Sequence, residues 1–394
     1  MARQVLLACA MTVVMAAVCG AAAAGDDAAG TQSYEERLKA LEADVKALSQ
    51  RVPAWINSIS LKGDLRYRYE MIDLDEDGNE VQHRNRIRAR FGLYAKINEH
   101  ADAAVALSTG GDDPVSGNLT LGDSFRRDEF RLDLAYINLH PTFVPNLNVW
   151  GGKISNPFFA PGKSELIWDH DLNPEGGAVT YKLSAGDIDF FANLGGFWVV
   201  ENGKGRSIDT GLFGAQGGAK ANLMSKKAHV IAGAGYFDYT NPQGKTMFYG
   251  APRGNTAVAN AYVYDYDELE AFAEAGAVIG GIDVAVFGDY VVNTGVGGGE
   301  KTGWLAGASI GKLKNQWDWA LRYNYRRLEG DAVIAAFTDS DFKGSGTDGK
   351  GHEIGADLMV LKNVTTGVTY FNNRSAIDRG KDYHRVQVDV AVKF

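Results

Sequence analysis

The last stretch of the chain alternates strictly between apolar and polar residues. In residues 383–394, the even positions from Val386 are apolar, and the odd positions from Arg385 are nearly all polar. Alternation with a period of two predicts a β-strand with one apolar face and one wet face. Such a strand fits a soluble sandwich, whose core covers the apolar row, or a transmembrane barrel, which turns that row toward lipid.

The same alternation recurs from Asn57 onward and predicts about sixteen antiparallel strands. Longer polar connections alternate with short ones. Short turns at one rim and long loops at the other are typical of outer-membrane barrels, whereas a Greek-key sandwich has no reason to keep this order. We therefore expect a transmembrane β-barrel over residues 54–394. Tight turns are expected at 185–186, 224–225, 280–281, 314–315 and 362–363.

Composition supports the barrel over the sandwich. The 394 residues include 48 glycines but only 9 prolines, and the 17 tyrosines and 18 phenylalanines would supply interfacial aromatic belts. Several apolar rows are small, such as Leu269 followed by Ala271 and Ala273. Residues this small would pack a soluble core poorly, while lipid requires only that they be apolar.

Residues 1–24 have the pattern of a cleaved secretory signal, with a basic start, an apolar stretch and a final run of alanines. No later segment has the ~20 apolar residues that a membrane-spanning helix needs. Both cysteines, Cys9 and Cys19, lie inside the signal, so the mature chain would have no thiol; lipid attachment at Cys19 is the alternative. Residues 25–32 are small and polar and predict a flexible lead.

Residues 33–52 carry a heptad pattern, with apolar residues at alternating spacings of four and three and charged residues elsewhere. This segment is too short to be stable as an isolated helix, which favours self-association as a periplasmic coiled-coil stalk. The alternative is one amphipathic helix that lies against the barrel mouth. The residues assigned to self-association are Leu38, Leu41, Val45 and Leu48.

One strand near the N-terminal end of the barrel carries a row of arginines. Arg84, Arg86, Arg88 and Arg90 lie on one face, with apolar residues on the other. Arg66 and Arg68 of the preceding strand, and Arg131 further along, are expected to join them. On a lumenal wall, this arginine ladder would act through confined water, where fields are focused. The alternative is that the arginines pair with the acids Asp64, Glu70 and Asp389.

Around this ladder, the sequence resembles a known family. The segments RNRIRARFGLYAKINEHADAAVALSTGGDDPVSGNLTLGDSF, LDLAYINLHP, GGKISNPFF and WDHDLNPEGGAVTYKL are similar to the putative porin family of Gram-negative outer-membrane barrels, most closely over residues 84–183. The resemblance implies a water-filled channel of the sixteen-stranded type that forms a homotrimer. The terminal Phe394 likewise resembles the closing aromatic residue that the barrel-assembly machinery reads. The resemblance does not imply a substrate.

The third long connection, residues 155–175, is the candidate constriction loop, because the third outer loop of porins folds into the barrel. Its apolar residues could fix it to the wall, and its acids could face the arginine ladder. Opposed charges across a narrow passage would orient polar solutes and penalise apolar ones. The alternative is an outward loop that closes over the barrel. The acids assigned to the constriction are Glu165, Asp169, Asp171 and Glu175.

The sequence carries little sign of enzymatic or cofactor chemistry. The seven histidines have no metal-ligand spacing, and there is no phosphate loop or G-x-S-x-G motif. Residues 73–80 begin like a calcium loop, but Arg84 stands where the bidentate Glu is required. We therefore expect no enzyme, no cofactor and no metal site. A net charge of −9 argues against nucleic acid as a partner.

These observations predict an outer-membrane porin that passes small hydrophilic solutes or ions passively. Its expected partners are outer-membrane lipid and lipopolysaccharide, further copies of itself, and the solutes. Two alternatives remain open at this point. One is a substrate-selective channel for small anions such as phosphate or organic acids. The other is a structural tether, in which the stalk attaches to the cell wall and the barrel is an anchor.

Overall fold

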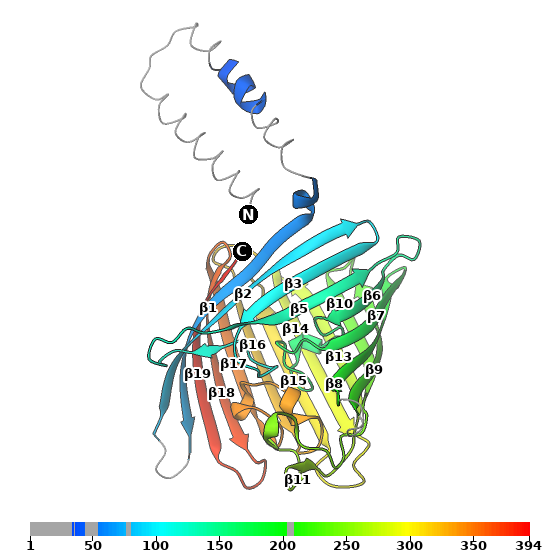
Figure 1. Ribbon diagram of the computed structural model, residues 1–394, viewed down its shortest axis with the longest axis vertical. Helices are drawn as coiled ribbons and strands as arrows, with labels where there is room; N and C mark the ends of the chain where they lie inside the picture. The colour runs from blue at the N-terminus through cyan, green and yellow to red at the C-terminus, as the bar shows by residue number, and fades with distance from the viewer. Residues whose placement is uncertain (1–33, 35, 44–53, 76–79, 203–208) are drawn as a thin grey trace.

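The computed structural model describes residues 34, 36–43, 54–75, 80–202 and 209–394. Residues 59–393 form one closed antiparallel β-barrel, and its first strand begins at the rim where its last strand ends, called here the rim of the chain ends (Figure 1). The sheet has seventeen strands, of which β4 (Leu119–Thr120) is a two-residue stub on β2. The other sixteen follow one another around the wall, and the last pairs with the first. The predicted sixteen-stranded barrel is confirmed.

The wall strands lie close to their predicted positions. They are β1 (Ile59–Leu74), β2 (Gln82–Asn98), β3 (Ala101–Thr109), β5 (Phe130–Leu139), β6 (Leu147–Lys153), β7 (Glu175–Ala185), β8 (Ile188–Val200), β9 (Thr210–Leu223), β10 (Ala228–Tyr239), β13 (Tyr266–Ile279), β14 (Ile282–Asn293), β15 (Thr302–Gly311), β16 (Trp319–Leu328), β17 (Gly349–Leu361), β18 (Val364–Ser375) and β19 (Asp382–Lys393).

The rim that holds the chain ends carries the short turns. Between β13 and β14, Gly280 and Gly281 have φ angles of 60° and 85°, the left-handed conformation that two-residue hairpin turns require. The turn predicted at 314–315 is longer than expected, since β15 ends at Gly311 and β16 begins at Trp319. The reason is Asp318, whose carboxylate accepts hydrogen bonds from the backbone N–H groups of Lys314 and Asn315 and closes a wider turn.

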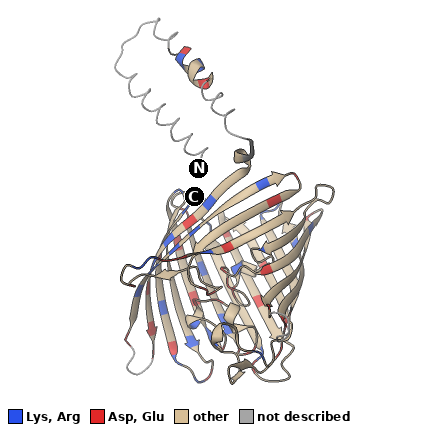
Figure 2. Ribbon diagram, in the orientation of Figure 1, with Lys and Arg blue, Asp and Glu red and all other residues tan. Residues whose placement is uncertain are grey.

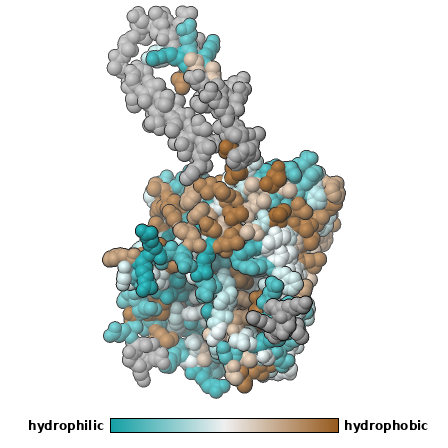
Figure 3. Space-filling model, in the orientation of Figure 1, coloured by the Kyte–Doolittle hydropathy of each residue, from teal (hydrophilic) through white to brown (hydrophobic). Residues whose placement is uncertain are grey.

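Apolar side chains face outward and charged ones face inward. On β13, the outward Leu269 is 45% exposed, whereas Glu268 and Glu270 on the other face are 0% and 3% exposed. A soluble sandwich would show the reverse. In the face that carries β1 to β5, apolar surface covers the half near the chain ends, and the other half is hydrophilic and hollowed (Figure 3).

Three long loops pack together within the barrel, at the rim opposite the chain ends. They join β6 to β7, β10 to β13 and β16 to β17. The N–H of Asp169 in the first loop bonds to the carbonyl of Phe337 in the third, at 2.9 Å, and Phe337 stacks on Phe248 of the second. Their apolar residues form one buried cluster with inward side chains of the wall, including Phe237 and Leu328. The short elements of these loops are η2 (Pro161–Lys163), η3 (Phe248–Gly250), β11 (Ala257–Val258), β12 (Ala261–Tyr262), η4 (Ala335–Phe337) and η5 (Phe342–Gly344).

The chain enters the barrel through a short element, η1 (Ala54–Ser58). In the predicted stalk, Tyr34 and residues 36–43 are helical, and Leu38 and Leu41 are 62% and 37% exposed. Val45, Leu48, the signal segment 1–24 and the lead 25–32 lie outside the described residues. Within the described part of the chain, no helix is long and apolar enough to cross a membrane.

Candidate functional site

The register between β1 and β2 gathers the arginines of the predicted ladder. Arg66 lies opposite Arg88, and Arg68 lies opposite Arg86. The residues between them on β1, such as Tyr67, are exposed on the outer surface, so the arginines face the lumen. Basic and acidic residues recur along these strands (Figure 2). We call the following seven residues the basic wall: Arg66, Arg68, Arg84, Arg86, Arg88, Arg90 and Arg385 of β19.

Carboxylates of the wall itself neutralise much of this charge, as the alternative interpretation expects. Asp64 lies 3.1 Å from Arg88 and 2.8 Å from Arg90. Asp389 accepts two hydrogen bonds from Arg68, each 2.7 Å. The carboxylate of Glu70 is fully buried and accepts hydrogen bonds from Arg84 and Arg385. The ion pairing that the alternative predicts is therefore present in the wall whose arginines face the lumen, and the effect of the ladder on solutes stays a prediction.

Arg385 and Asp341 are members of this network that the sequence does not single out. Asp341 belongs to the loop between β16 and β17, and its two oxygens lie 3.0 Å from Arg68 and 2.8 Å from Arg385. Burial opposes the charge of Asp341, but Arg385 and Arg68 outweigh it and hold the pKa of this carboxyl well below its usual range. No residue pattern indicates that this loop enters the barrel.

The predicted constriction loop, residues 155–175, contacts inward side chains of β9, β13 and β14. The N–H of Phe159 bonds to Gln216 of β9, and the N–H of Gly162 bonds to Glu274 of β13, each at 2.7 Å. Gly162 has a left-handed φ of 56°, and a Cβ there would lie 2.2 Å from the ring of Phe287 on β14. Glycine is therefore needed where the loop meets the far wall.

Only one of the four predicted loop acids reaches the arginines. Asp171 lies 3.2 Å from both Arg88 and Arg90, so it is attached to the ladder and does not face it across a gap. Glu175 pairs at 2.7 Å with Lys153, where β6 and β7 end together. The expectation that all four acids face the ladder is thus wrong for Glu175.

Glu165 and Asp169 are also directed elsewhere. Glu165 bonds to His170 at 2.6 Å, and Asp169 accepts a 2.9 Å bond from the N–H of Ser340. Burial raises the pKa of the Glu165 and Asp169 carboxyls. Burial also disfavours the charge of His170, but its bond to Glu165 outweighs this and raises the pKa of His170. Glu165 therefore bonds within its own loop, and Asp169 connects that loop to the one between β16 and β17.

Arg131 does not join the ladder. It pairs at 3.0 Å with the exposed Glu129. The pairing of β3 with β5 is irregular here, since Ala106 lies opposite Leu134 and Leu107 opposite Leu132, which leaves Asp133 as an extra residue. A bulge of this kind bends the strand and redirects its side chains. A single-strand pattern gives no sign of it.

A second set that the sequence analysis missed is acidic and lies on β13. The inward Glu268 and Glu274 accept hydrogen bonds from the N–H groups of Ile334 and Gly162, at 3.2 and 2.7 Å. Glu270 accepts one from Gln216 at 2.8 Å. The alternation of these glutamates with Leu269 and Ala271 would have been enough to predict their inward direction. Their role as anchors for the loops depends on the path of the loops.

The architecture is similar to that of known proteins with solved structures. The fold is similar to that of Pseudomonas putida OprB, at 12% identity and a TM-score of 0.59, over 86% of this chain and 95% of that one. It is also similar to Salmonella typhi OmpF, at 15% identity and a TM-score of 0.52, over 85% and 97%. No curated protein sequence matches the chain. The profile of a family described as putative porin matches residues 74–278 and 255–394. Because that profile covers most of the sequence, the chain belongs to the putative porin family of outer-membrane β-barrels.

Proposed function

We propose that the barrel is a passive diffusion channel for small hydrophilic solutes and ions, and that it selects them where residues 155–175 meet the basic wall. The observation that carries this proposal is the contact of Asp171 with Arg88 and Arg90. Fixed charges of both signs in a narrow passage favour polar solutes, because an apolar solute displaces ordered water without replacing its hydrogen bonds.

The balance of charge at the wall favours anions. Its seven arginines meet five carboxylates, which are Asp64, Glu70, Asp171, Asp341 and Asp389. The surplus supports the second candidate, a channel selective for small anions such as phosphate or organic acids. Among the described residues, the Nε atoms of Arg66 and Arg86 are buried and have no hydrogen-bond partner.

Ion selectivity in planar bilayers tests the role of the wall. The double substitution Arg86→Ser and Arg88→Ser should move the reversal potential in a salt gradient toward cation preference, because it removes two positive charges from the passage. An unchanged reversal potential would show that these arginines do not line the passage. Saturable block of the wild-type conductance by phosphate would favour the selective channel over general diffusion.

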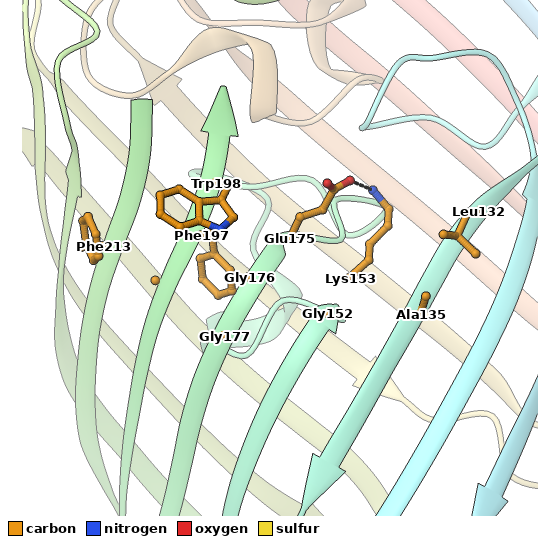
Figure 4. A pocket seen from close by; sticks show the side chains of 11 residues that line it. Leu132, Ala135, Gly152, Lys153, Glu175, Gly176, Gly177, Phe197, Trp198 and Phe213 are labelled. Atoms are coloured by element: carbon orange, nitrogen blue, oxygen red, sulfur yellow. Dashed lines mark hydrogen bonds and ion pairs between the residues drawn. The ribbon is translucent and has the colours of Figure 1, made fainter. Parts of the chain in front are cut away.

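We propose further that the barrel forms a homotrimer. Its outer wall has a hollow of about 640 Å³ where β6 and β7 end early; Leu132, Trp198 and Phe213 lie around it, beside the Lys153–Glu175 ion pair (Figure 4). In the loop between β3 and β5, Phe125 is fully exposed. An exposed apolar side chain and an apolar hollow elsewhere on the same chain suit a head-to-tail contact, which closes into a ring. Insertion in steps of three equal conductances is expected, whereas single steps would contradict the trimer.

The N-terminal segment is proposed to lie in the periplasm, at the rim that holds the short turns, and residues 33–52 are proposed to associate as a stalk. The exposure of Leu38 and Leu41 supports this, because an unpaired apolar seam favours association. It also supports the tether as a further candidate. Deleting residues 33–52 distinguishes a structural tether from a channel. If the protein is a tether, the deletion should reduce envelope integrity; if it is a channel, the deleted protein should keep its conductance.

A further inference from the structure

A cavity of about 440 Å³ lies where β3 and β6 end and where β5 and β7 begin, beside Arg90 in the middle of β2. Its volume is that of a site for a small organic molecule. The rest of the lining comes from residues 111–117, from the end of the constriction loop and from Tyr249. It carries charges of both signs: Arg90, Arg131, Lys153, Asp112, Asp113, Asp133, Asp171 and Glu175.

Several of these charges are already matched within the protein. Arg90 lies 3.2 Å from Asp171, and Lys153 lies 2.7 Å from Glu175. Asp113 lies 3.7 Å from Arg253. These groups shape the cavity, but a solute would have to displace an existing partner to use them.

Arg131 and Asp133 have weaker partners within the protein. The side chain of Arg131 is 50% exposed, and its partner Glu129 is 74% exposed; exposed pairs of this kind contribute little. Asp133 accepts a 2.7 Å hydrogen bond from the neutral amide of Asn173. Arg131 and Asp133 therefore each have capacity for a charged ligand, and the exposed Asp112 adds a further carboxylate to the lining.

The two groups are close enough to hold one small molecule. They are two residues apart on β5, about 6.6 Å along a strand, and both line the cavity, whereas Leu132 between them is also 51% exposed on the outer wall. Alternation accounts for this arrangement, because residues two apart on a strand face the same side, and the bulge changes the phase only after Asp133. A molecule with its own carboxylate and ammonium could satisfy both groups together.

We propose that this cavity binds small zwitterions of the amino-acid class, with the solute carboxylate on Arg131 and its ammonium on Asp133. The site would hold such solutes beside the constriction at Asp171, and this role rests on the proposed channel function. A simple anion would meet Asp133 as a like charge, and a simple cation would meet Arg131 in the same way. A zwitterion makes two charge-assisted hydrogen bonds and leaves neither group facing a like charge.

Calorimetric titration of the full-length protein in detergent tests the site without requiring conduction. Alanine is the zwitterionic probe, and ethylammonium and propionate are its single-charge analogues. Alanine should bind at least about tenfold more tightly than either analogue, the worth of one charge-assisted hydrogen bond. Equal affinity for all three probes would overturn the proposal.

Two substitutions assign the contacts. Arg131→Gln and Asp133→Asn should each weaken alanine binding about tenfold, with Asp133→Asn sparing propionate and Arg131→Gln sparing ethylammonium. Lys314→Gln, in an exposed turn pair at the other rim, is the matched control and should change nothing. Unchanged alanine binding in both variants would remove the site. Bilayer conductance separates the two proposals: a conducting protein without alanine binding loses only the site, and a binding protein without conductance loses only the channel.

Discussion

The two sides of the lumen are held by different chemistry. Toward β10 and β13 to β16, the loops pack in an apolar cluster, in which the ring centroids of Phe158 and Phe237 are 4.9 Å apart, and the inward glutamates of β13 add hydrogen bonds to this packing. Toward β1, β2 and β19, the contacts are ion pairs around buried groups such as Glu70 and Arg385. The apolar side resembles the core of a soluble protein and sets where the loops lie. The charged side borders the proposed passage and sets what it favours.

The largest effect is expected from Glu70→Ala on the charged side. This substitution removes the carboxylate that pairs with Arg84 and one of the two that pair with Arg385, and removing one partner of a buried ion pair costs about 3–5 kcal/mol. The temperature at which the folded band is lost on electrophoresis should fall markedly. Asp283→Asn, in the exposed pair with Lys314, is the control and should change stability by no more than about 0.5 kcal/mol.

Phe158→Ala tests the apolar side. It removes a ring that packs on Phe237, Trp168 and Phe197, and losses of this kind cost about 3 kcal/mol. Because residues 155–175 lose an anchor, single-channel conductance should rise while the anion-to-cation ratio stays the same. A changed anion-to-cation ratio with unchanged conductance would contradict the idea that the apolar side positions the loops and the charged side determines ion preference.

Asp341→Asn should shift ion selectivity toward anions and leave the single-channel conductance unchanged. This is the reverse of the result expected for Phe158→Ala. It removes one negative charge that lies between Arg68 and Arg385. A change of about 1 kcal/mol in local charge interaction corresponds to roughly fivefold in the anion-to-cation permeability ratio. Reversal potentials measure this ratio. A shift toward cations would contradict the assigned geometry.

The smallest expected effect is a pH dependence of the loop contacts around Glu165 and His170. The folded protein raises the pKa of both groups, so the folded state holds protons more tightly than the unfolded chain. The stabilisation is therefore present at low pH, and it is lost as pH rises from about 4.5 for Glu165 and above about 6.5 for His170. Glu165→Gln should flatten the fall in melting temperature between about pH 5 and pH 8. An unchanged slope would exclude this pair as the source.

Much of the barrel could be predicted because a strand pattern is local. Alternation locates the strands, and Gly280 and Gly281 mark a tight turn with their own backbone preferences. The gathering of Arg66 with Arg88 could be predicted too, since adjacent antiparallel strands place their inward residues side by side.

The loop contacts could not be predicted in the same way. The pairing of Asp341 with Arg68 joins residues 273 positions apart, and it depends on the path of a loop that lacks a repeating pattern. The bulge at Asp133 depends on how β5 pairs with β3, which neither strand specifies alone. The inward glutamates of β13 form an intermediate case, since alternation gives their direction and only the folded loops give their partners.

The seam between β1 and β19 has a consequence for biogenesis. The backbone of Phe394 exchanges hydrogen bonds with Gly63, and Arg68 finds Asp389 across 321 residues of sequence. The first strand thus stays an open edge until β19 pairs with it. A chain that lost only its last strand would keep most of its sequence, yet it could not shut its wall. Only a chain that includes β19 can therefore close the barrel.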